Sequence, residues 1–282
     1  MKFLHVFLTD LKKILLQAAF PLSALFFGAL CFTTVVTQVN GVSLTVLEAA
    51  LYYAPEQILD KLHSSAREMF LGGLGTYNVM FAPMVAALPA VPLYCRERSG
   101  GALRFIIPRC GIKRRSLSMV AAAMLSGGLV VLLGYALYGL CCAAIFPPPS
   151  ARLLAMYAEY GYGSVPYIVK QLACVFLFGC TSTLPAVLLS ALTKNAYVVL
   201  CGAFSVLYGL NSLWSQVAIS AASADSWQLY SWATVLNPSE VRWLFNHTPS
   251  ETLYTVLLWL AVTLLTLFVV LLSFKKRFDR GT

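Results

Sequence analysis

The sequence predicts an all-α integral membrane protein with six transmembrane helices. Hydrophobic residues make up 59% of the chain and charged residues only 11%, so a soluble domain of 282 residues could not bury the apolar surface. The apolar residues also form long uncharged runs, and a helix needs about 20 such residues to cross a bilayer core. Membrane-spanning strands are not expected, because strands of membrane barrels alternate apolar and polar residues, whereas these runs are apolar on every face.

An amphipathic helix is expected at the N-terminus, before the first of these runs. Lys2, Asp10 and Lys12 lie off its apolar stripe, on the aqueous side. Such a helix lies in the membrane interface rather than across the bilayer. The stripe consists of Phe3, Leu4, Phe7, Leu8 and Leu11.

Each of the six apolar runs is predicted to be one transmembrane helix. The third run ends at the proline triplet 147–149, Lys194 separates the fourth from the fifth, and the sixth ends at Lys275. No soluble linker or internal repeat stands out, so residues 1–282 are predicted to form a single membrane domain. The predicted spans are residues 14–36, 70–94, 117–145, 168–192, 196–213 and 253–274.

The connection between the fifth and sixth spans, residues 214–251, is rich in aromatic residues. Tryptophan favours the interface between membrane and water, and Pro238 interrupts the segment. Two interpretations stay open, an aromatic anchor at the membrane surface and a re-entrant element that dips into the outer leaflet. The tryptophans are Trp214, Trp227, Trp232 and Trp243.

The basic residues predict how the helices are oriented. They gather before the first span, between the second and third, between the fourth and fifth, and after the sixth, whereas acidic residues dominate the other connections. The positive-inside rule places the basic side in the cytoplasm, with both termini inside and the protein in the cell membrane. Because the basic residues flank spans, the net charge of +9 does not indicate binding to nucleic acid.

Motifs for catalysis and metal binding are missing. The chain has no P-loop, no GxSxG motif and no paired membrane aspartates, so it is not expected to be an enzyme or to hydrolyse ATP by itself. His5, His63 and His247 are scattered, and the eight cysteines include no CxxC pair, so neither a metal site nor a disulfide framework is expected.

Few polar residues lie inside the predicted spans. Lys170 is the only charged one, near the outer end of the fourth span, and an interfacial anchor is favoured over a contact with an anionic substrate group. Asn78 and Gln171 are the other candidates for a substrate path. Ion-driven transporters and proton pumps carry acidic, histidine or arginine residues within their spans, so secondary transport is not expected.

The connection between the second and third spans is the most informative segment. Gly100 and Gly101 permit a turn, an apolar stretch follows, and Pro108 is expected to stop the helix at Ile107. We expect a short helix that presses against a cytoplasmic partner, with Glu97, Arg98 and Arg104 in solvent. A plain basic connection is the alternative. The candidate contact residues are Arg96, Glu97, Arg98, Gly100, Gly101, Leu103, Arg104, Phe105 and Pro108.

This segment resembles the coupling helix of ABC-2 type permease subunits, the type V exporter architecture of ABC transporters. The family pattern is an acidic residue, a glycine a few positions later, an apolar helix, and a proline followed by basic residues. The amphipathic N-terminal helix and the six spans also resemble that family. The matching residues are Glu97, Gly100, Leu103, Ile107, Pro108, Arg109 and Lys113.

The resemblance implies an ATP-driven exporter of two permeases and two nucleotide-binding subunits. ATP and Mg²⁺ would bind to the partner ATPase, and the coupling helix would carry its movement into the spans. The second permease would be a copy of this chain or a paralogue, in contact through spans one and five, and the substrate a peptide, antibiotic or lipid-like molecule. The alternative is a non-transporting membrane sensor or scaffold that docks a cytoplasmic partner.

Overall fold

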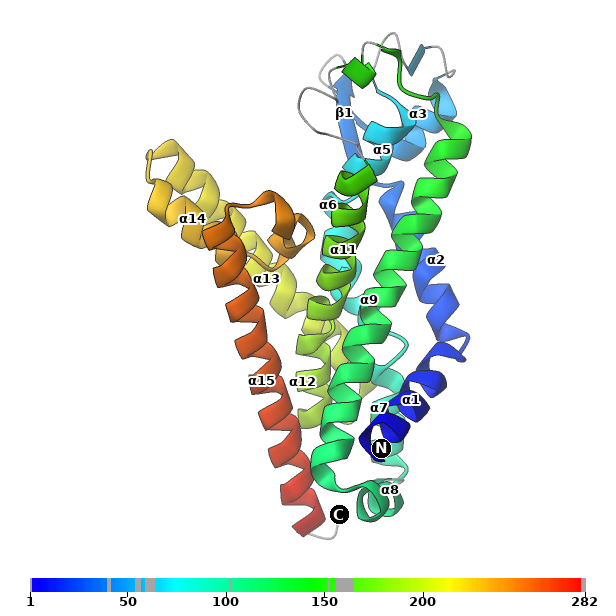
Figure 1. Cartoon of the computed structure of the whole chain (residues 1–282), viewed down its shortest axis with the longest axis vertical. Coiled ribbons are helices and arrows are strands. Elements are labelled where there is room, and N and C mark those ends of the chain that lie inside the picture. The colour runs from blue at the N-terminus through cyan, green and yellow to red at the C-terminus, as the bar shows by residue number, and fades with distance from the viewer. Residues whose placement is uncertain are drawn as a thin grey trace.

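The computed structural model describes residues 2–39, 42–53, 57–58, 64–101, 103–151, 153–155 and 165–279. Within them the chain is an elongated bundle of helices with a small β-hairpin at one end (Figure 1). Five helices in these ranges are long and apolar enough to cross a membrane, or six if a bent pair at the N-terminus is one span. The predicted class, a largely helical membrane protein, agrees with this architecture.

The N-terminal part differs from the single span predicted over residues 14–36. α1 covers Lys2–Leu15 and α2 covers Ala19–Cys31, and a bend of 61° separates them. α1 is amphipathic, and its Leu4 and Leu8 are exposed. Exposed leucines on one side are typical of a helix that lies on a membrane surface.

A two-stranded antiparallel sheet follows α2, although no strand is expected from the sequence. β1 covers Val35–Val39 and β2 covers Val42–Thr45. β-branched residues fill most of β1 and half of β2, and they favour extended backbone over a continued helix. Thr45 then starts α3, Val46–Tyr52, in a capping box with Glu48. Hydrogen bonds from the Thr45 backbone and side chain lower the pKa of Glu48.

The second span also departs from the predicted range 70–94. Three short helices replace it, and the candidate span runs over Tyr77–Ser99. Its start moves because the glycine-rich stretch at residues 72–75 interrupts the helix, and its end moves because the helix continues through charged residues. The three helices are α5 (Ala66–Gly72), α6 (Thr76–Ala87) and α7 (Val91–Ser99).

The later predicted spans correspond to helices with shifted ends. Two consecutive helices, α11 and α12, make up the span predicted at residues 168–192, and α13 extends well beyond residue 213. The connection predicted at residues 214–251 is therefore the end of α13 followed by α14 and η1. The bounds are α8 Leu103–Cys110, α9 Ile112–Ile145, α11 Val165–Ser182, α12 Leu184–Leu192, α13 Ala196–Ser223, α14 Trp227–Leu236, η1 Pro238–Asn246 and α15 Pro249–Asp279.

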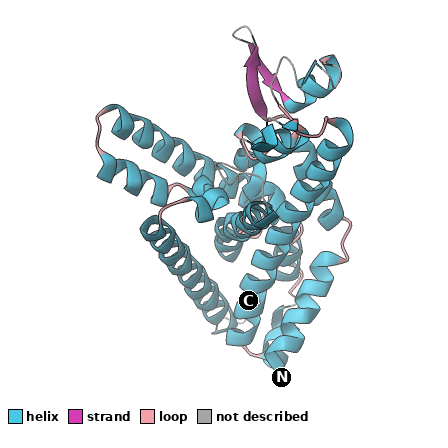
Figure 2. Cartoon of the chain, turned by 45° about the horizontal axis from the view of Figure 1, so that its top comes forward, coloured by secondary structure: helices cyan, strands magenta, loops and turns pink. Residues whose placement is uncertain are grey.

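α14 folds back along α13, and the two form a helical hairpin that projects from the bundle (Figures 1 and 2). The turn between them contains Asp225, whose φ of 53° lies in the left-handed region that aspartate tolerates. Trp227 and Trp232 are exposed on α14. The aromatic segment is thus an ordered helical element rather than an irregular loop.

α9 lies at the centre of the bundle, where α1, α2, α6, α11 and α15 pack against it (Figure 1). Two of its glycines allow close approach. A Cβ on Gly134 would lie 2.5 Å from the carbonyl oxygen of Ala24, and one on Gly127 would lie 2.1 Å from the Thr183 side chain. Small residues at such crossings let helices pack tightly in a membrane.

Candidate functional site

The segment predicted to contact a partner lies at the end of the bundle that also carries α1 and the last turns of α15, here called the α1–α8 end (Figure 1). α8 is a separate helix between α7 and α9. Glycines flank it in left-handed backbone conformations, with φ of 72° at Gly101 and 81° at Gly111. Because a side chain would strain the backbone at either position, these glycines fix the direction of α8.

One face of α8 is exposed. Phe105, Pro108 and Arg109 share this face at i, i+3 and i+4 spacing, and Phe105 is 72% exposed. On the other side, Ile107 is buried and Leu103 packs against the core. α8 therefore presents an apolar and basic surface away from the bundle. Arg104 is also part of α8, and its side chain lies outside the described part of the structure.

Pro108 does not stop the helix at Ile107, in contrast to the prediction. The helix continues to Cys110, and the Gly111 N–H donates to the Ile107 carbonyl at 2.8 Å. The N–H that proline lacks would have bonded to the carbonyl of residue 104, so a helix this short loses only one such bond. α8 ends instead at Gly111, whose positive φ does not continue the helix.

Glu97 and Arg98 are largely buried, whereas the sequence predicts that both are solvated. Both belong to the end of α7, whereas their neighbours Arg96 and Ser99 are exposed. The Arg98 guanidinium donates to carbonyls at the C-terminus of α12, at 2.9 Å from Thr193 and 3.2 Å from Leu192. A cation is favourable there because the last carbonyls of a helix lack intrahelical partners and carry partial negative charge.

A buried ionic cluster joins α1, α7 and α9. The Arg115 guanidinium donates to the carboxylates of Asp10 and Glu97, and the Ser118 hydroxyl also donates to Asp10. The Arg115 side chain is 2% exposed, and Lys13 lies 3.4 Å from Glu97 at the rim. Two acids and two bases balance in this Arg115 cluster, as charges removed from water require.

The placement of Asp10 on the aqueous side of the N-terminal helix is wrong. Asp10 is buried in line with Phe7 and Ile14, on the side of α1 that faces α9. This i, i+3, i+7 spacing was the signal available in the sequence. Arg115 gives no comparable signal, because it follows two exposed basic residues and looks like part of the charged flank of a span.

The three candidates for a substrate path do not form one site. Asn78 is buried, donates to the Gly73 carbonyl and lies 3.6 Å from Cys31 Sγ. Gln171 is buried and donates to the Arg242 carbonyl at 3.2 Å. Lys170 is exposed. No described hydrogen bond joins these side chains, and the two amides act as local links between segments.

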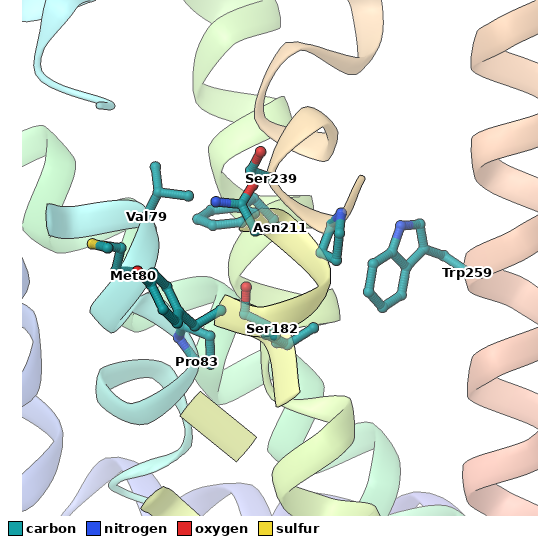
Figure 3. Close-up of a pocket in the computed structure, with 11 residues that line it drawn as sticks. Val79, Met80, Pro83, Ser182, Asn211, Ser239 and Trp259 are labelled. Carbon is teal, nitrogen blue, oxygen red and sulfur yellow. The ribbon is translucent and has the colours of Figure 1, made fainter. Parts of the chain in front are cut away.

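A pocket that the sequence does not indicate lies between α6, α11, α13, η1 and α15 (Figure 3). Its empty volume is about 320 Å³, part of it open to the outside of the molecule. Most of its lining is apolar, with a few hydroxyl, amide and indole groups. The lining residues are Val79, Met80, Pro83, Phe178, Ser182, Leu207, Tyr208, Asn211, Pro238, Ser239 and Trp259.

The buried ion pairs at the α1–α8 end join α7 and α9, which flank α8 in the chain, to each other and to α1. Within the described ranges, no three His, Cys, Asp or Glu side chains converge as metal ligands would. No model of a known protein family matches the chain, and no curated protein matches it either.

Proposed function

We propose that this chain is the membrane permease subunit of an ATP-driven ABC exporter of the ABC-2 type. A separate nucleotide-binding subunit holds ATP and Mg²⁺ and hydrolyses ATP, and the permease moves a peptide, antibiotic or lipid-like substrate. The observation that carries the proposal is the construction of α8, a short helix with an exposed face, held between glycine turns beside the Arg115 cluster.

The connections of α8 to the bundle support a role in transmitting force. Glu97 lies in the last turn of α7 and Arg115 in the first turn of α9, so the ion pair between them joins the two helices that flank α8. Asp10 extends the link to α1. Arg98 extends it to the end of α12, where Ser273 of α15 also donates to a carbonyl. A displacement of α8 would therefore reach five helices.

The charge distribution supports a cytoplasmic position for the α1–α8 end. Exposed basic residues gather there on several elements, among them Lys12 of α1, Lys113 and Arg114 of α9, and Lys275 and Lys276 of α15. With this end inside the cell, the positive-inside rule is satisfied and both terminal helices are cytoplasmic at their chain ends. The β1–β2 hairpin and α14 then lie on the outer side.

A second permease would complete the transport path. α2 and α13 carry exposed apolar side chains, including Leu22, Leu25 and Phe26 on α2 and Tyr197 and Val198 on α13. These helices correspond to the spans through which the resembled family pairs. Either a copy of this chain or a paralogue fits this role.

Co-purification in mild detergent tests the proposal. The wild-type chain should bring down a P-loop ATPase, and Phe105→Ala should lower its recovery about tenfold, because exposed aromatic side chains often dominate an interface. Phe268→Ala is the matched control, since Phe268 is an exposed phenylalanine on α15. Recovery of a cytoplasmic protein without ATPase motifs would instead support the sensor or scaffold, and undiminished capture by Phe105→Ala would remove α8 from the interface.

A further inference from the structure

The pocket between α6, α13 and α15 contains two buried polar atoms without a partner. Asn211 Oδ1 and Trp259 Nε1 are both shielded from solvent, and neither has a hydrogen-bond partner within the described structure. Both residues line this pocket, and Figure 3 shows the Trp259 indole reaching from α15 toward the side chains of the other helices. A buried polar group without a partner is costly, and most such groups in native proteins are satisfied by another molecule if not by the protein.

The two groups are chemically complementary to each other. The Asn211 carbonyl oxygen accepts a hydrogen bond, and the Trp259 indole N–H can only donate one. A hydroxyl group can satisfy both, because it donates one hydrogen bond and accepts others. A carboxylate could only accept, and an ammonium group could only donate, so each would leave one of the two atoms unpaired.

Other groups at the same place add polarity without charge. Pro83 has no N–H, so it cannot donate the i to i−4 hydrogen bond that the Val79 carbonyl would otherwise accept. Ser182 adds a hydroxyl from α11. The residues that line the pocket include no Asp, Glu, Lys, Arg or His. An ion would therefore have no counter-charge here, and burial without one is strongly unfavourable.

We propose that this pocket binds the hydroxyl end of an uncharged, largely apolar alcohol. The hydroxyl lies between Asn211 Oδ1 and Trp259 Nε1, and the apolar part lies against side chains such as Val79, Phe178 and Leu207. The enclosed part of the pocket has room for a group about the size of a water molecule. That size fits a hydroxyl head, and the open side of the pocket leaves room for the chain attached to it.

The site stands apart from the proposed transport function. It lies within one chain and draws nothing from the α1–α8 end, from ATP or from a second permease. Binding can therefore be measured on the purified chain in lipid nanodiscs. If a partner ATPase were never found, the binding result would be unaffected, and if binding failed, the co-purification test would keep its meaning.

Photolabelling with a long-chain alcohol that carries a diazirine tests the proposal. Two probes of the same length serve as comparisons, one with a methyl group and one with a carboxylate in place of the hydroxyl. The alcohol should label peptides from α6, α11, α13 or α15 at the pocket, and unlabelled alcohol should compete. The methyl and carboxylate probes should label them at least about fivefold less, the factor expected for one lost hydrogen bond.

Two substitutions test the residues. Asn211→Leu and Trp259→Phe remove the acceptor and the donor, and each should weaken labelling by the alcohol about fivefold. Ser205→Ala and Trp227→Phe are the controls, because both residues are exposed and neither lines the pocket. Equal labelling by all three probes in the wild-type chain, which needs no variant to fold, would overturn the proposal and leave water as the partner of both atoms. Unchanged labelling in both pocket variants would overturn it as well.

Discussion

The Arg115 guanidinium donates to the Asp10 carboxylate across the junction of α9 and α1, although the two residues are 105 positions apart in the chain. Both side chains are almost completely buried. The contact turns the N-terminal helix into part of the bundle instead of a loose membrane anchor. The ion pair therefore joins the N-terminal helix to α9, the helix that directly follows α8 in the chain.

Replacing Arg115 should destabilise the protein strongly. In Arg115→Met, the carboxylates of Asp10 and Glu97 stay buried without their cation, and breaking a buried pair in this way costs about 3–5 kcal/mol. Arg114→Met is the control, because Arg114 is exposed and such substitutions usually change stability by less than about 0.5 kcal/mol. Chemical unfolding in detergent measures both, and equal stability of the two variants would contradict the role of the cluster.

Arg98 should hold the end of α12 against α7. In Arg98→Met, the carbonyls of Leu192 and Thr193 lose their donor, so the last turn of α12 should open more often. Hydrogen exchange of amides in this turn should quicken about tenfold or more, the factor that corresponds to about 1.5–3 kcal/mol for a hydrogen bond to a charged group. Arg96→Met, which removes an exposed neighbour, should leave the exchange unchanged.

A side chain at either glycine beside α8 should lower the stability of the protein. Gly101→Ala and Gly111→Ala place a Cβ at positive φ, where the penalty is about 1–2 kcal/mol even though no atom lies within 4 Å of the new methyl group. Gly209→Ala also meets nothing within 4 Å, but it lies in the regular helix α13, so it should raise stability by up to about 1 kcal/mol. Similar effects at all three positions would show that backbone conformation does not set the direction of α8.

Acid should weaken the start of α3. Hydrogen bonds from Thr45 lower the pKa of Glu48 in the folded protein. The charged carboxylate therefore stabilises the capping box at any pH above the pKa of Glu48 in the unfolded chain, which is 4.5. This stabilisation is lost as the pH falls through and below that value. Amide protection in α3, corrected for the intrinsic exchange rate, should fall in this range in the wild-type chain. In Glu48→Gln, amide protection in α3 should be lower than in the wild-type chain at neutral pH and should change little as the pH falls.

The sequence predicts the helices far better than the site. Uncharged apolar runs are enough to find α9 and α15, because a bilayer requires such runs. Strand β1 at Val35–Val39 is missed because a stretch rich in β-branched residues looks the same at the end of a span and in a strand. The Arg115 cluster and the pair of Asn211 and Trp259 are missed because their members are distant in sequence, and only the packing of the bundle brings them together.

Crosslinking from α8 in living cells tests the central claim most directly. A photoreactive amino acid at position 105 should form a covalent product with a cytoplasmic protein that carries a P-loop, and the same group at position 268, exposed on α15, should not. Labelling of position 105 by a membrane-impermeant reagent added outside intact cells would contradict the account, as would products with lipid alone.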